Sequence, residues 1–306
     1  MDGIKRVAVV GCGTVGASWA ALFLAHDREV DAYDPSPGAE ERLRGFVDHA
    51  LAQLAELGTG GSGRLRFSSD LGEAVRAADL VQENAPEDEA LKRRMLAEIE
   101  RLAPEGAIVA SSTSALLRSS IVADCKRTQR FIIAHPFNPP HLVPLVELFG
   151  EDAEVVEQAA AFYRALGRRT VVLKREMPGH IANRLSSALF REAVYLVEQG
   201  VATVADIDAA LCNGPGLRWA AMGPHMTYHL GGGAGGIQHY FAHLGPSQAR
   251  RWASLGSPTL TPDVQARIIE GVKEEARGRS VTELEERRDR ALLNILKSRI
   301  EVAGDP

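Results

Sequence analysis

A glycine-rich turn at residues 11–16 constrains this chain most. Its sequence is G-C-G-T-V-G, which follows the pattern G-x-G-x-x-G. Residues 5–10 before the turn are apolar and partly β-branched, and residues 17–25 after it are good helix formers. Residues 29–33 form a second strand-like run that closes on Asp34. This order of strand, turn, helix, strand and acid predicts one βαβ unit.

The glycines of this turn have separate uses in a dinucleotide-binding site. Gly11 permits the tight turn, Gly13 lets the backbone approach a pyrophosphate, and Gly16 lets the helix pack closely on the strand. The start of the helix offers N–H groups and a partial positive charge to phosphates. A glycine turn without a ligand is the alternative, but the flanking elements favour a cofactor site. We expect the cofactor to contact Gly11, Gly13, Thr14, Val15 and Gly16.

Asp34 at the end of the second strand indicates which dinucleotide is bound. A carboxylate there can accept hydrogen bonds from ribose hydroxyls, and it repels a 2′-phosphate. The next arginine after Asp34 is Arg42, so no basic residue stands ready for that phosphate. The cofactor is therefore expected to be NAD rather than NADP. A solvated turn aspartate before Pro35 is the alternative.

Strand-like and helix-like runs alternate as far as residue 173, and beyond Pro178 almost all runs are helix-like. The fold class predicted is α/β, a doubly wound, mostly parallel sheet followed by a helical domain. We expect an NAD-binding domain over residues 1–178 and a helical domain for substrate binding and dimerisation over residues 179–306. The glycine-rich residues 231–236 are expected to form a mobile loop.

Composition and charge narrow the class of protein. The chain has 306 residues, 45% hydrophobic and 25% charged, with a net charge of −5. This balance is typical of a globular protein and argues against nucleic acid or an anionic membrane as partner. The cysteines Cys12, Cys125 and Cys212 lack the spacing of a disulfide framework or a zinc site. With no signal peptide and no membrane-spanning run, the expected location is cytoplasmic.

A second informative stretch runs from His135 to Glu147. His135 ends a strand-like run, a proline-rich turn follows, and an apolar run containing Glu147 returns. A returning chain can bring the carboxylate beside the imidazole, where it fixes the tautomer and makes the other ring nitrogen a better base. Spacing alone favours this pair no more than the alternative, in which His135 is a capped histidine at a strand end and Glu147 a surface acid on an edge strand.

With these motifs, the sequence resembles the 3-hydroxyacyl-CoA dehydrogenase superfamily over nearly the whole chain. The resemblance implies that His135 is the catalytic histidine and Glu147 its acidic partner. It implies that Ser114, in Ser-Ser-Thr-Ser, and Asn183, in Asn-Arg-Leu, contact the reacting oxygen and hold the substrate. Glu87 and Lys92 match a glutamate and a lysine that related enzymes use around the cofactor. For these two, ordinary helix chemistry is the alternative.

Within this superfamily the sequence is similar to the branch that acts on free hydroxy acids, which includes L-carnitine dehydrogenase and L-gulonate 3-dehydrogenase, the λ-crystallin relatives. Arg218 and Trp219 belong to the matching residues. A guanidinium can hold a substrate carboxylate by two hydrogen bonds, and an indole face can hold a quaternary ammonium by cation–π attraction. A surface arginine and a core tryptophan are the alternative.

We therefore expect NAD-dependent oxidation of the 3-hydroxyl of a small 3-hydroxy acid, resembling L-carnitine or L-gulonate. A 3-hydroxyacyl-CoA dehydrogenase acting on a short-chain thioester and a non-catalytic NAD-binding protein are the alternatives. No metal is expected, because His225, His229 and His239 stand without a cysteine or acid cluster. The resemblance also implies a homodimer.

Overall fold

The computed structural model describes residues 3–302, and the chain forms two compact units. The first unit holds the described residues up to Asn183 together with those from Glu286 onward. The second unit holds the residues between them, Arg184–Glu285. The chain therefore leaves the first unit once and returns to it. The predicted domain boundary after residue 178 stays a prediction.

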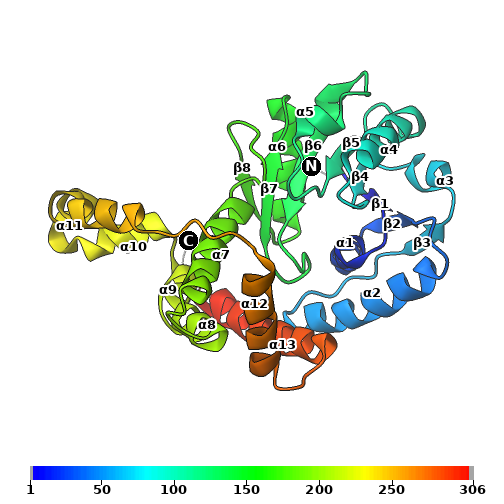
Figure 1. The fold of residues 1–306 in the computed structure, drawn as a ribbon. Coiled ribbons are helices and arrows are strands. Elements are labelled where there is room, and N and C mark those ends of the chain that lie inside the picture. Colours follow the sequence, from blue (N-terminus) through cyan, green and yellow to red (C-terminus); the bar gives the residue numbers. More distant parts are fainter. Residues whose placement is uncertain (1–2, 303–306) are drawn as a thin grey trace. The chain divides into compact units, whose positions relative to one another are not determined.

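Within residues 3–302, the first unit is built on one sheet of eight strands in the order β3-β2-β1-β4-β5-β6-β7-β8 (Figure 1). Neighbouring strands are parallel except β6 and β7, which are antiparallel. The predicted mostly parallel, doubly wound sheet is confirmed. The strands are β1 (Arg6–Val10), β2 (Glu29–Tyr33), β3 (Leu65–Ser68), β4 (Leu80–Glu83), β5 (Ile108–Ser111), β6 (Phe131–Pro136), β7 (Leu145–Phe149) and β8 (Arg169–Val172).

Helices cover both faces of this sheet, and the alternation of side chains along β1 shows why. Val7 and Val9 join one hydrophobic cluster, whereas Ala8 and Val10 join the other. Successive residues of a strand point to opposite faces, so a strand buried on both sides reads as one apolar run. The first cluster is completed by α1 (Thr14–Ala25), α2 (Ala39–Glu56) and α6 (Ala153–Ala165), and the second by α3 (Leu71–Val75), α4 (Glu89–Leu102) and α5 (Arg118–Ile121).

Local signals in the sequence set where several of these helices begin. Asp88 caps α4, its Oδ1 accepting from the Leu91 amide at 2.6 Å, and Asp152 caps α6 in the same way. Such caps satisfy amides that have no partner within the helix. Helix α6 is absent from the predicted elements, although Asp152 is an ordinary start signal for a helix.

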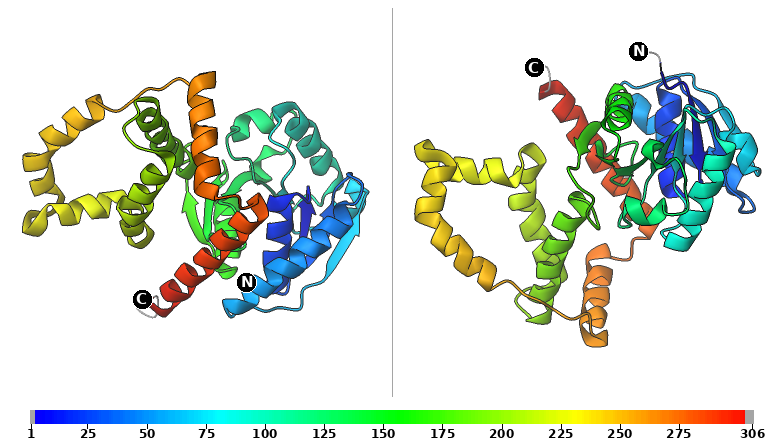
Figure 2. Two further views of the ribbon diagram at one scale, coloured as in Figure 1. Left: turned by 60° about the horizontal axis from the view of Figure 1, so that its bottom comes forward. Right: turned by 90° about the horizontal axis from the view of Figure 1, so that it is seen from above.

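The helix α13 (Val281–Val302) brings the chain back to the first unit. From residue 286 onward it meets the C-terminal end of α2 (Figures 1 and 2). The carboxylate of Glu56 on α2 accepts from Arg290 and from Lys297, each at 2.9 Å. Both contacts are partly exposed, so they position α13 more than they stabilise it.

A buried chain of hydrogen bonds centred on His141 joins the same helices. His141 Nδ1 lies 2.7 Å from the Ser18 hydroxyl on α1, and its Nε2 lies 2.7 Å from Gln53 Oε1 on α2. Gln53 Nε2 in turn donates to Asp289 of α13 at 3.3 Å. Because a carboxylate only accepts, Gln53 must turn its amide nitrogen to Asp289 and its oxygen to His141. Nε2 of His141 therefore carries a proton, and because burial lowers the pKa of this histidine to about 4, His141 is neutral at pH 7.

The described part of the second unit is entirely helical, which confirms the predicted helical region. The stretch around residues 231–236 differs from the expected mobile loop: it is a short 3₁₀ helix between two α-helices. Gly233 and Gly236 have φ of 60° and 58°, a backbone that glycine adopts readily and that ends one helix before the next begins. The helices are α7 (Ala182–Glu198), α8 (Val204–Asn213), α9 (Pro215–Ala221), α10 (Pro224–Gly231), α11 (Gly236–Ala253) and α12 (Pro262–Ala276).

None of the helices formed by residues 3–302 combines the length and the apolar character needed to cross a membrane.

Candidate active site

The glycine turn between β1 and α1 has the shape that a dinucleotide requires. Gly11 has φ of +87°, and its amide donates to the Tyr33 carbonyl at 2.8 Å. A Cβ on Gly16 would lie 1.9 Å from the Gly11 carbonyl oxygen, so only glycine allows this packing. A Cβ on Gly13 would meet nothing within 4 Å. The protein itself therefore leaves the Gly13 side of the turn open for a ligand.

The first turn of α1 is also free of competing groups. Gly13 stands at its N-cap without a side-chain hydrogen bond, and the first turn contains no acidic residue. The opening amides of α1 and its partial positive charge are therefore available to an anion. The turn thus fits the pyrophosphate of NAD.

Asp34 lies at the end of β2, beside this turn. One carboxylate oxygen accepts from the Cys12 amide at 2.8 Å and the other from the Ser36 amide at 2.9 Å. Burial alone would raise the pKa of Asp34, but these hydrogen bonds outweigh it and hold the pKa below its usual value. The charge and the position of the carboxylate are thus both fixed.

A cavity of about 660 Å³ adjoins Asp34 and is lined by Pro35, Phe67, Glu40 and Glu41 among others. Its apolar walls suit an adenine ring. Arg44 also lines it, but its guanidinium donates to Glu40, so the acids of this cavity disfavour a 2′-phosphate.

His135 and Glu147 face one another across the antiparallel pair β6 and β7, where they are direct register partners. His135 Nδ1 lies 2.8 Å from Glu147 Oε2, and both side chains are buried. The other carboxylate oxygen accepts from the amides of Ile181 and Ala182, at 2.8 and 3.0 Å. The structure thus brings together two residues that the sequence separates by a proline-rich turn.

These contacts fix the protonation of the pair. Burial alone would raise the pKa of Glu147, but the hydrogen bonds from His135, Ala182 and Ile181 outweigh it and hold the pKa below its usual value. Glu147 is therefore a carboxylate and can only accept, so Nδ1 of His135 must donate. The free lone pair of His135 is on Nε2, which makes Nε2 the basic atom of the pair.

Ser114 and Asn183 also lie together. Asn183 Nδ2 donates to the Ser114 carbonyl at 3.1 Å, while the Ser114 hydroxyl donates to Glu87 at 3.2 Å. The same Glu87 oxygen accepts from the Ser114 and Ala115 amides, each at 2.8 Å. Glu87 therefore holds the loop that carries Ser114.

A cavity of about 190 Å³ is lined by five of the predicted residues, namely Val15, Glu87, Lys92, Ser114 and His135. Glu147 and Asn183 are absent from its wall and are linked to it through His135 and Ser114. The lining residues are Val15, Asn84, Ala85, Glu87, Lys92, Ser112, Ser114, His135, Pro136 and Asn138.

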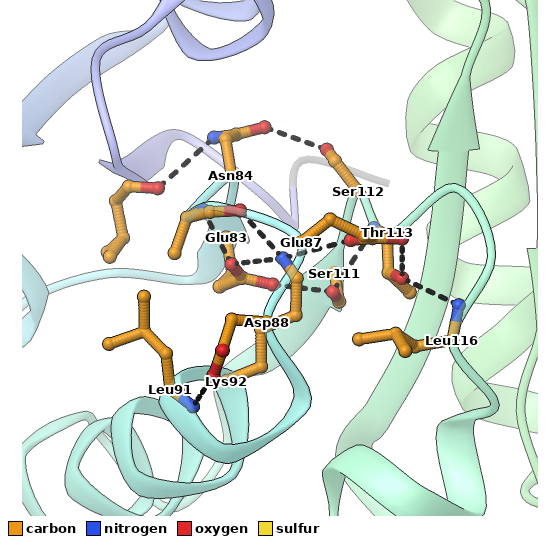
Figure 3. A network of polar contacts seen from close by, with 12 residues as sticks. Glu83, Asn84, Glu87, Asp88, Leu91, Lys92, Ser111, Ser112, Thr113 and Leu116 are labelled. Atoms are coloured by element: carbon orange, nitrogen blue, oxygen red, sulfur yellow. Dashed lines mark hydrogen bonds and ion pairs between the residues drawn. The ribbon is translucent and has the colours of Figure 1, made fainter. Parts of the chain in front are cut away.

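Figure 3 shows a buried ion pair beside this cavity that the sequence analysis missed. Lys92 Nζ donates to Glu83 Oε1 at 2.7 Å and to the Ala85 carbonyl at 2.9 Å, and it lies 3.8 Å from Glu87. Glu83 also accepts from the Ser111 hydroxyl at 2.5 Å. In the sequence, this pair could have been suspected from Glu83, a charged residue at the end of the otherwise uncharged strand L-V-Q-E.

Lys92 therefore already donates two hydrogen bonds within the protein, to Glu83 and to the Ala85 carbonyl, and lies near the charge of Glu87. Its predicted place in the cofactor site stays a prediction. In this structure its ammonium positions Glu83 and the start of the loop that carries Glu87.

Arg218 and Trp219 lie on α9 in the second unit, and both are exposed, Trp219 by 41%. Neighbouring residues of a helix point about 100° apart, so these two side chains diverge. Their predicted role in substrate binding stays a prediction.

The sequence matches known dehydrogenases over most of its length. Residues 6–177 match the family described as "3-hydroxyacyl-CoA dehydrogenase, NAD binding domain", and residues 179–257 match its C-terminal domain. An L-carnitine dehydrogenase of Nocardiopsis dassonvillei is 45% identical, over 98% of this chain and 93% of its own. An L-carnitine dehydrogenase of Bacillus cereus is 43% identical, over 97% and 93%.

A solved structure shares the fold. It is a 5-formyl-3-hydroxy-2-methylpyridine 4-carboxylic acid 5-dehydrogenase, described as an NAD⁺-dependent dismutase. Its TM-score is 0.83 at 30% identity, covering 95% of this chain and 97% of that one.

Proposed function

The chain belongs to the 3-hydroxyacyl-CoA dehydrogenase family and is an NAD-dependent dehydrogenase, and on that premise we propose that it oxidises the 3-hydroxyl of a small 3-hydroxy acid. L-carnitine is the first candidate and L-gulonate the second. The observation that carries the chemistry is the buried contact of 2.8 Å between His135 and Glu147 at a cavity of about 190 Å³.

His135 acts as the general base in this proposal. Glu147 keeps the proton of His135 on Nδ1, so Nε2 can take the proton of the substrate hydroxyl. The negative Glu147 then stabilises the imidazolium that forms. Ser114 and Asn183, which are already linked to each other, steady the substrate oxygen as it becomes a carbonyl.

The cofactor site uses other residues of the same unit. The amides that open α1 hold the pyrophosphate beside Gly13, and Asp34 accepts from the ribose hydroxyls. NAD, when bound there, would supply the acceptor for the hydride that leaves the substrate carbon. Glu87 keeps the loop of Ser114 in place, and Lys92 supports that loop through Glu83 and the Ala85 carbonyl.

Arg218 and Trp219 are proposed to recognise the ends of the substrate. L-carnitine carries a carboxylate on one side of its hydroxyl and a quaternary ammonium on the other. Arg218 suits the carboxylate and Trp219 suits the ammonium. Their divergence on α9 is compatible with opposite ends of one molecule.

A second candidate is a short-chain 3-hydroxyacyl-CoA, because both family matches are to 3-hydroxyacyl-CoA dehydrogenase domains. A panel of L-carnitine, L-gulonate, 3-hydroxybutyrate and 3-hydroxybutyryl-CoA separates the two, with NADH formation followed by absorbance. We expect the highest kcat/KM for a free hydroxy acid. A higher value for the thioester would select the second candidate, and NAD binding without turnover of any substrate would contradict both.

We also propose that the protein is a homodimer. The described second unit exposes large apolar side chains on α10 and α11, among them Met226, Leu230, Phe241 and Trp252. Exposed apolar groups gathered on one unit are typical of a contact surface. Light scattering should give twice the mass of one chain, and Phe241→Asp should shift it towards the monomer. A monomeric parent protein would contradict the proposal.

A cytoplasmic location is proposed as well, since a reducing compartment fits the three free cysteines.

A further inference from the structure

The chain makes an unusual turn as it approaches Glu147. Residues 177–180 form a β-turn in which the His180 amide donates to the Met177 carbonyl at 2.9 Å, with Gly179 at φ of 74°. His180 itself then has φ of 50°. The left-handed region is unfavourable for a residue with a Cβ, and such residues gather at functional sites. This backbone directs the next two amides, of Ile181 and Ala182, onto Glu147.

The His180 side chain contacts both Thr113 and His135. It is 3% exposed, and its Nε2 lies 3.0 Å from the Thr113 carbonyl. Its ring centroid lies 5.0 Å from that of His135, with the planes 42° apart. One residue therefore touches the His135 ring and the loop of Ser114, and its own backbone leads to the amides on Glu147.

These contacts also define the protonation of His180. A carbonyl oxygen only accepts, so Nε2 must donate to Thr113. Burial lowers the pKa of His180, and the neighbouring His135 lowers it further, against the opposing effect of the Thr113 carbonyl. His180 is thus a neutral imidazole. It supplies a ring and one N–H donor without placing a positive charge beside His135.

We propose that His180 is a positioning residue of this active site, whose ring packs against His135 and whose N–H holds the Thr113 carbonyl, so that His135 and Ser114 keep their relative placement. The proposal rests on the function proposed above for His135 and Ser114. His180 is not among the described residues that line the cavity, so it acts through these two residues rather than on the substrate.

The ring and the donor can be separated by two substitutions. His180→Phe keeps an aromatic ring beside His135 but cannot donate to Thr113. His180→Gln lacks the ring but can place an amide donor at a similar reach. Arg277→Gly is the matched control for backbone strain, because Arg277 ends α12 of the second unit at φ of 51°.

We expect His180→Phe to lower kcat by roughly tenfold, the effect of one lost hydrogen bond at a reacting site, with the KM for NAD nearly unchanged. His180→Gln should lower kcat as well, because it keeps a donor for Thr113 but removes the ring that packs against His135. Arg277→Gly should leave kcat at the parent value. Values of kcat equal to the parent in both His180 variants would overturn the proposal. The proposal would also be overturned if both His180 variants lost kcat equally and this loss were explained by a lower Tm alone. If His180→Phe does not fold, His180→Asn replaces it, since asparagine tolerates the left-handed backbone but is too short for Thr113.

A second measurement does not depend on the substrate. The proton on His135 Nδ1, bound to Glu147, should give a downfield imidazole resonance in ¹H NMR, assigned by its loss in Glu147→Gln. We expect the resonance to persist in His180→Phe, which keeps the ring beside His135, and to shift or broaden in His180→Gln, which lacks it. An unchanged resonance in both would overturn the proposal. If the parent oxidises no hydroxy acid, the proposed function fails, and this resonance still decides whether His180 positions His135.

Discussion

The ammonium of Lys92 lies 2.7 Å from the Glu83 carboxylate, and neither side chain is more than 1% exposed. Breaking a buried pair leaves one charge without compensation, whereas removing both charges does not. We expect Lys92→Met to lower the free energy of unfolding by about 3–5 kcal/mol and the double variant with Glu83→Gln to recover part of the loss. Urea unfolding measures both.

Arg101 on the same helix is the control for this experiment. It pairs with Glu98 at 3.6 Å on the surface, so Arg101→Met should change stability little. If Lys92→Met were as mild as Arg101→Met, the buried pair would not hold this part of the site together.

The two glycines of the turn before α1 should respond differently to alanine. In Gly16→Ala the new Cβ would lie 1.9 Å from the Gly11 carbonyl oxygen, so the fold must shift and Tm should fall. In Gly13→Ala no protein atom lies within 4 Å of the new Cβ, so Tm should be unchanged. The Kd for NAD should nevertheless rise by about tenfold or more, because the methyl group occupies the path of the pyrophosphate. Unchanged NAD binding in Gly13→Ala would place the pyrophosphate elsewhere.

The charge of Asp34 should decide between NAD and NADP. Asp34→Asn keeps an acceptor for the Cys12 or the Ser36 amide but removes the charge that repels a 2′-phosphate. We expect the preference for NAD over NADP, measured as the ratio of kcat/KM values, to fall by about tenfold. Asp31→Asn on the same strand is the control, since Asp31 binds Arg66 and lies outside the cavity of Asp34. An unchanged ratio would assign the preference to other residues.

Removing the proposed base should slow turnover without weakening cofactor binding. We expect His135→Gln to lower kcat by roughly 10²–10⁴-fold at an unchanged Kd for NAD. Glu147→Gln should lower it less, because the glutamine can still accept from Nδ1 but no longer stabilises the imidazolium by its charge. The control His49→Gln changes an exposed histidine of α2 and should have the kcat of the parent. A His135 variant with the parent's kcat would show that another group takes the proton.

The buried His141 should make stability depend on pH. Burial lowers the pKa of His141 to about 4, whereas in the unfolded chain it is about 6.5. Between these values the unfolded chain binds the extra proton, so stability is lost as pH falls. From pH 7 to pH 5 this histidine alone should cost about 2 kcal/mol. Urea unfolding of the parent and of His141→Gln measures the difference, and the variant should show a smaller drop. Equal drops would assign the pH dependence to other groups.

The βαβ start of the chain could be predicted because its determinants are local. The apolar strand, the glycine turn and Asp34 follow one another directly, and the structure places β1, α1 and β2 within a residue or a few of the expected bounds. The antiparallel pairing that joins His135 to Glu147 could also be predicted, because the proline-rich turn between them is short.

The missed residues have no local signature. His180 resembles any residue after a Pro-Gly turn, and only the packing of three distant segments brings it to Thr113 and His135. The bounds of α9, α10 and α11 have no clear local signature either. Their glycines, and Pro246 within α11, read as breaks, while many of their apolar side chains are exposed and give no buried stripe.

The return of α13 makes the cofactor-binding unit discontinuous in the chain, with the whole second unit inserted between its parts. On the ribosome, the strands of the sheet emerge first and must wait for the inserted unit before Asp289 can reach Gln53. At about 5–20 residues per second this wait lasts on the order of ten seconds. The NAD-binding unit is therefore completed only after the inserted unit and the first turns of α13 have been synthesised.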